Sequence, residues 1–140
     1  MTMPHNKTGF NRGLDLFNRG HFFDAHEVLE DVWREAPLHS VSRRRLQGVV
    51  QLAVAFHHQS KGNHVGARSV LERAMRNISD ADSSFPDLDL DRLRADLACW
   101  REHLDNCVGA REKCLEGRDV RRHGVCNSKA PALPKIRKRR

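Results

Sequence analysis

Glycine and proline divide this sequence into segments that each have the apolar spacing of an α-helix. The predicted helices cover residues 11–19, 22–35, 41–61 and 64–78, with a last one from about Asp87 or Asp89 to 116. No segment alternates polar and apolar residues over a useful strand length. The sequence therefore predicts an all-α fold, a compact bundle of about five helices arranged as helical hairpins.

The second and fourth predicted helices have related sequences. GHFFDAHEVLEDVW starts at Gly20 and GNHVGARSVLERAM starts at Gly62, an offset of 42 residues. Gly, Ala, Val, Leu and Glu coincide, and a small Ala beside Val-Leu suits two helices that approach closely. The pattern is weakly similar to the helix pairs of tetratricopeptide-type repeats, with only two copies present.

The net charge of +7 over 140 residues is unevenly distributed. Residues 117–140 contain nine Lys and Arg and one Asp, whereas the remainder contains 16 basic and 17 acidic residues. We therefore expect a single helical domain over 1–116 and a basic tail over 117–140, which its proline content and charge predict to be disordered. Nucleic acid or an anionic surface is a possible partner for the tail only.

Other features exclude a membrane protein. No apolar run approaches the ~18 residues that a membrane span requires, and the N-terminus lacks the apolar core of a signal peptide. We expect no membrane partner and a cytoplasmic location. The cysteines contain no CxxC pair, and we expect them to be reduced, small core residues: Cys99, Cys107, Cys114 and Cys126.

The segment 22–35 places two polar side chains on its apolar face. Glu30 lies about 40° from His26 on a helical wheel, whereas Glu27 lies on the solvent face. His57, on the next helix, also points inward. One hypothesis is a structural His26–Glu30 hydrogen bond; the other is a divalent-metal site with His26, Glu30 and His57 as ligands and Glu30 as catalytic base. HEVLE does not complete the HExxH motif of zinc proteases.

Three consecutive arginines lie near the start of the third predicted helix. Positive charge there opposes the helix dipole, so compensating acids are required. We expect these to be the acidic side chains of the preceding helix. The expected pairs therefore join Arg43, Arg44 and Arg45 to Asp24, Glu27 and Asp31.

The strings FNRGHFFDAHEVLEDVWREA and LQGVVQLAVAFHHQSKGNHVGA together resemble the domain-of-unknown-function family 309, over roughly Leu14 to Met75. The resemblance implies a compact all-helical bundle and the label of a predicted metal-dependent hydrolase, in which a metal-bound water would be the nucleophile. The matching motif positions are His26, Glu27, Glu30, Trp33, Gln47, Gly48, Gln51, His57, Gly62 and Asn63. His58 shares a predicted polar stripe with Gln47 and Gln51.

Two functions are therefore predicted for the helical domain. The first is metal-dependent hydrolysis at the His/Glu cluster. The alternative is a non-catalytic helical protein-interaction module, whose partner is another protein or a second copy of the chain. The sequence itself names no substrate.

Overall fold

The computed structural model describes residues 7–115 and 129–139. Its helices are α1 (Lys7–Asn18), α2 (Phe22–Glu35), α3 (Val41–Ser60), α4 (His64–Asn77), the short 3-10 helix η1 (Ala81–Ser83) and α5 (Leu90–Leu115). Within these residues, the backbone pairing outside helices is a single antiparallel bridge between Leu88 and Lys138. The all-α prediction is confirmed. The predicted bounds of α2 are those observed, whereas α1 begins at Lys7 rather than at residue 11.

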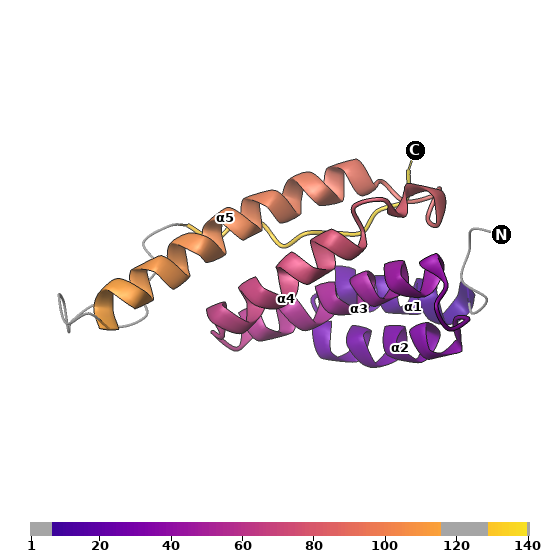
Figure 1. The fold of residues 1–140 in the computed structure, drawn as a ribbon, viewed down its shortest axis with the longest axis horizontal. Coiled ribbons are helices and arrows are strands. Elements are labelled where there is room, and N and C mark those ends of the chain that lie inside the picture. The colour runs from indigo at the N-terminus through magenta and orange to yellow at the C-terminus, as the bar shows by residue number, and fades with distance from the viewer. Residues whose placement is uncertain (1–6, 116–128, 140) are drawn as a thin grey trace.

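Each helix packs mainly against its neighbours in the sequence, from α1 through to α5. Figure 1 shows α1, α2 and α3 grouped together, with α4 leading from them to the long α5. α2 therefore packs against α1 and α3 and leaves its remaining side toward solvent. A chain of aromatic rings, Phe17, Phe22, Phe56 and Trp100, joins α1 and α2 to α5 through the core, with ring centroids 5.2 to 5.7 Å apart.

The two related segments occupy equivalent structural positions. Gly20 and Gly62 have positive φ angles of 83° and 76°, a conformation that strongly favours glycine, and each reverses the chain before the next helix. Ala25 and Ala67, five residues later, are both fully buried. The leucines of the two segments, at positions 29 and 71, are also buried. The sequence similarity therefore corresponds to the same packing of two helices.

Residues 129–139, here called the C-terminal strap, lie extended beside α1 and α5 (Figure 1). Pro134 and Ile136 are buried. The side chain of Asn18 donates to the carbonyl of Ile136 at 3.0 Å and accepts from its amide at 2.8 Å. Trp100 Nε1 donates to the carbonyl of Ala132 at 2.9 Å. The expectation of disorder is wrong for this segment, because buried side chains and backbone hydrogen bonds hold it; residues 117–128 lie outside the described part of the chain.

Two further expectations concern cysteine and the membrane. Cys99 is a free, exposed thiol, whereas Cys107 is buried and disulfide-bonded. The expectation of reduced core cysteines is therefore wrong for Cys107, which is not reduced, and for Cys99, which is not in the core; the side chains of Cys114 and Cys126 lie outside the described part of the structure. In the described helices, none combines the length and the apolar character that crossing a bilayer demands.

Candidate functional site

Helix α2 is fixed by one buried face. Ala25, Leu29 and Val32 lie on that face, at the spacing of successive helical turns. A Cβ on Gly13 would come within 2.5 Å of Leu29, so the glycine allows α1 to lie close against α2. This packing determines which α2 side chains point to solvent.

His26 and Glu30 do meet, one turn apart on α2. His26 Nε2 lies 3.0 Å from Glu30 Oε2, and Arg34 Nη2 lies 2.6 Å from Glu30 Oε1. Both carboxylate oxygens of Glu30 therefore already have partners. The side chains of His26 and Glu30 keep 28% and 27% of their exposure, so the pair is half-buried at the edge of the apolar face and not within the core.

The structure does not assemble these two residues and His57 into a metal site. The exposed ring of Phe23 contacts both imidazoles, with centroid distances of 6.1 Å to His26 and 5.4 Å to His57. Among the residues that the structure describes, no three or more His, Cys, Asp or Glu side chains are grouped as ligands for one ion. The predicted ligands therefore share a surface with Phe23, and their arrangement gives no support to a metal or catalytic role.

Trp33 and Arg43 join the C-terminal end of α2 to the start of α3. The guanidinium of Arg43 lies 4.5 Å from the centroid of the Trp33 ring, a cation–π contact. Arg43 also donates to the carbonyl of Ala36 at 2.8 Å and to that of Arg34 at 3.3 Å. These carbonyls are helix-end acceptors that lack a partner within α2. Trp33 and Arg43 therefore have a structural role in the α2–α3 hairpin.

The other two arginines turn toward the segment after α4. Arg44 contacts Asp80 at 2.9 Å and Arg45 contacts it at 3.4 Å. Hydrogen bonds from Arg45 and Arg44 lower the pKa of Asp80. Arg45 also donates to Ser83 and Ser84. The expected pairing with the acids of α2 is therefore wrong, because the α3–α4 packing places a nearer carboxylate beside these arginines.

The remaining motif residues lie at the junction of α3 and α4. Gln51 accepts from Asn77 at 2.8 Å. Asn63 caps α4 by accepting from the amide of Gly66 at 2.9 Å, and its amide nitrogen lies 3.4 Å from His58. Gln47 is exposed. The contacts of Asn63 hold the turn between the two helices, and the Gln51–Asn77 hydrogen bond joins the middle of α3 to the end of α4. None of these contacts extends the His26–Glu30 pair.

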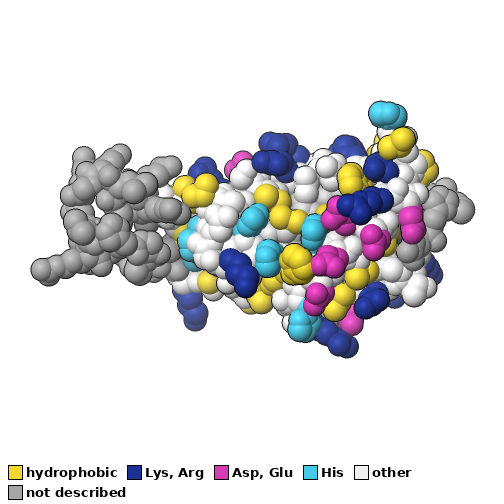
Figure 2. Space-filling model, turned by 90° about the horizontal axis from the view of Figure 1, so that it is seen from below, with side chains coloured by type: hydrophobic (Ala, Val, Ile, Leu, Met, Phe, Trp, Pro, Cys, Tyr) yellow, Lys and Arg dark blue, Asp and Glu magenta, His cyan; other side chains and the backbone are white. Residues whose placement is uncertain are grey.

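The outward face of α2 carries a row of carboxylates next to an exposed aromatic ring. Phe23 is 51% exposed. A hollow of about 230 Å³ adjoins it, between residues 20–24 and the C-terminal end of α3. Figure 2 shows acidic side chains gathered beside histidines on one face of the molecule. The exposed acids follow helical spacing and make no ion pair with other described residues: Asp24, Glu27, Asp31 and Glu35.

Sequence analysis identifies the acids of this surface but misses Phe23. The residue stands next to the buried Phe22, and its pairing with a second phenylalanine suggests a core position. The available signal is its place on the helix, because Phe23 lies one turn before Glu27 and therefore borders the solvent face. The exposed ring of Phe23 therefore gives this surface an apolar side chain.

The outward face of α2 lies within the part of the chain that is similar to known proteins. The family described as "Domain of unknown function (DUF309)" matches residues 10–70, which contain most of α1, all of α2 and α3 and the first half of α4, and this confirms the resemblance for that part of the chain. The chain is 34% identical over 73 residues to "Uncharacterized protein YpuF" of Bacillus subtilis (strain 168), which covers 52% of this chain and 41% of that protein. It is 26% identical over 96 residues to an "Uncharacterized protein" of Aquifex aeolicus (strain VF5), covering 69% and 26%. The chain thus matches less than half the length of either relative.

Proposed function

We propose that this protein is a non-catalytic helical interaction module that binds a basic segment of another protein on the outward face of α2. The observation that carries the proposal is the row of exposed carboxylates beside the exposed ring of Phe23. Apolar anchors give a protein interface most of its affinity, and complementary charge around them selects the partner. A segment that places one apolar side chain between Lys and Arg residues fits this surface.

The pairing of the arginines supports this proposal. Arg44 and Arg45 are directed to Asp80, and Arg43 to Trp33 and backbone carbonyls. The acids of α2 therefore keep their charge available to a partner. Attraction by exposed carboxylates is screened by salt over about 8 Å at physiological ionic strength, so binding weakens as salt rises.

Metal-dependent hydrolysis, the function that the family label implies, would require Glu30 to exchange its partners. Arg34 holds one carboxylate oxygen at 2.6 Å and His26 holds the other at 3.0 Å. A cation at Glu30 would have to displace a guanidinium that is already neutralising it. The interaction module requires no such rearrangement.

The C-terminal strap supports a second candidate function, binding to nucleic acid. Burial of Ile136 places neighbouring basic side chains at the surface, so that Lys135, Arg137 and Lys138 are exposed on a segment fixed to the body of the protein. Phosphate contacts from such residues depend strongly on salt. Replacing the three with Gln should abolish low-salt binding to a duplex DNA probe; unchanged binding refutes this role.

Photo-crosslinking tests the α2 surface directly. A photoreactive phenylalanine analogue at position 23 should yield a discrete protein adduct in cells. The adduct should be lost when Asp24 and Asp31 are both changed to Lys. Leu38, which is 73% exposed in the α2–α3 turn, is the control position for the crosslinker. Identical adducts from positions 23 and 38, or an adduct that survives the charge reversal, would contradict the proposal.

A further inference from the structure

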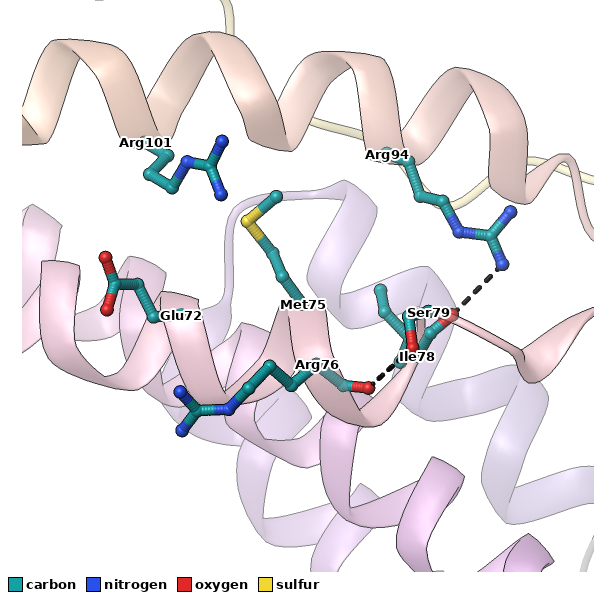
Figure 3. A pocket seen from close by; sticks show the side chains of 7 residues that line it. All are labelled: Glu72, Met75, Arg76, Ile78, Ser79, Arg94 and Arg101. Atoms are coloured by element: carbon teal, nitrogen blue, oxygen red, sulfur yellow. Dashed lines mark hydrogen bonds between the residues drawn. The ribbon is translucent and has the colours of Figure 1, made fainter.

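A second hollow lies between α4 and α5, away from the α2 surface. Its volume is about 600 Å³, within the range of pockets that hold small molecules. Arg94 and Arg101 of α5 both project toward α4, and Met75 of α4 rises between them (Figure 3). The two arginines are seven residues apart and therefore lie on the same side of the helix.

Arg94 forms one end of this hollow, and both of its terminal guanidinium nitrogens already have partners. Its guanidinium lies 2.8 Å from the carboxylate of Asp82 and donates to the carbonyl of Ile78 at 3.0 Å. A hydrogen bond from Arg94 lowers the pKa of Asp82. Arg94 therefore closes this end of the hollow and connects α5 to the end of α4.

The other charged side chains that line the hollow carry more positive than negative charge. Arg76 and Arg101 are exposed and make no side-chain hydrogen bond or ion pair within the described part of the chain. Glu72 supplies the acidic side chain in the lining. Two unpaired guanidinium groups against one carboxylate leave a charge of about one unit for a ligand to neutralise.

The floor of the hollow is apolar. Ile78 is buried, and Met75 is partly buried against the core. Methionine is flexible and adapts its shape to an apolar partner. A ligand that reaches Arg101 therefore also covers the side chain of Met75.

We propose that this hollow binds a small amphiphilic carboxylate, with its carboxylate on Arg101 and its apolar body on Met75. A guanidinium can hold a carboxylate by two parallel hydrogen bonds, which fixes the orientation of the bound group. Arg76 on the opposite wall adds attraction for the anion. The site is independent of the α2 surface, because the two share no lining residue.

Methyl NMR of the full chain provides a local measurement. The chain contains three methionines, and Met75 lines the hollow while Met1 and Met3 lie at the N-terminus. With ¹³C-methyl methionine, sodium hexanoate should shift the Met75 signal saturably and leave the other two unchanged. Hexanol and inorganic phosphate are the comparison probes. Each should bind at least about tenfold more weakly than hexanoate, because hexanol lacks the carboxylate and phosphate lacks the apolar chain.

Two variants separate charge from general binding. Arg101→Gln should weaken hexanoate binding about tenfold through the loss of its charge-assisted contacts. Arg92→Gln, also an exposed arginine of α5, should leave the affinity unchanged. Circular dichroism verifies that both variants fold. The proposal is overturned if hexanoate gives no saturable shift, if hexanol or phosphate binds equally well, or if Arg101→Gln binds like the unaltered protein.

Discussion

Docking of the C-terminal strap should depend on Ile136. Its side chain is 4% exposed, and Ile→Ala in a buried site costs about 2–5 kcal/mol. The lower part of that range applies, because the strap lies at the surface and can detach instead of leaving a cavity. We expect Ile136→Ala to lower the free energy of unfolding by about 2–3 kcal/mol, or Tm by about 6–10 °C for a chain of this size.

Leu133→Ala is the matched control on the same strap. Leu133 is 50% exposed, so its truncation should change stability by less than about 0.5 kcal/mol. Thermal and urea unfolding followed by circular dichroism measures both variants. Equal Tm values for Ile136→Ala and Leu133→Ala would refute docking through Ile136.

Asn18 provides an independent check on the same contact. Its side chain makes two hydrogen bonds to the backbone of Ile136, so Asn18→Ala should cost about 1–3 kcal/mol. If the strap detaches in either single variant, the double variant Asn18→Ala with Ile136→Ala should lose less free energy of unfolding than the sum of the losses in the two single variants. Full additivity would show that the two residues do not act on one docking event.

Three further predictions concern charge, helix packing and metal. Hydrogen bonds from arginine lower the pKa values of Asp80 and Asp82, so the contribution of these two aspartates to stability is present above about pH 4 and is lost as the pH falls through the lowered pKa values. Asp80→Asn should therefore flatten this part of an acid-unfolding curve. An unaltered curve would contradict this prediction. Gly48→Ala should destabilise by about 1–3 kcal/mol, because its Cβ would lie 2.7 Å from Ile78. Gly109→Ala, with nothing within 4 Å, should instead stabilise by about 0.5–1 kcal/mol in urea unfolding, and the same sign for both would disprove the packing argument. Calorimetric zinc titration should give the same result for His26→Ala and the unaltered protein, whereas loss of stoichiometric binding in the variant would restore the metal-site hypothesis.

The helices were predictable because their signals are local. Glycines with positive φ stand at the turns before α2 and α4, and apolar spacing marks the buried face of each helix. Ala25 and Ala67 then indicate where neighbouring helices approach. The strap was missed because its basic composition outweighs a shorter signal. Pro134 and Ile136 alternate with exposed basic residues, which is the period of an extended segment with one buried side.

The candidate site shows why a helical wheel is insufficient for polar residues. The wheel gives the direction of His26 and Glu30 relative to the apolar face, but their depth depends on which helices cover that face. Since α2 packs against α1 and α3 only along one side, His26 and Glu30 lie beside the buried face and stay half-buried, where Arg34 reaches Glu30 from the same helix. The pairing of Arg44 and Arg45 likewise depends on a non-local carboxylate, because Asp80 lies beside them only after α3 and α4 have packed. Local sequence therefore identified the charged residues, and tertiary packing decided which of them were neutralised and which remained available on α2.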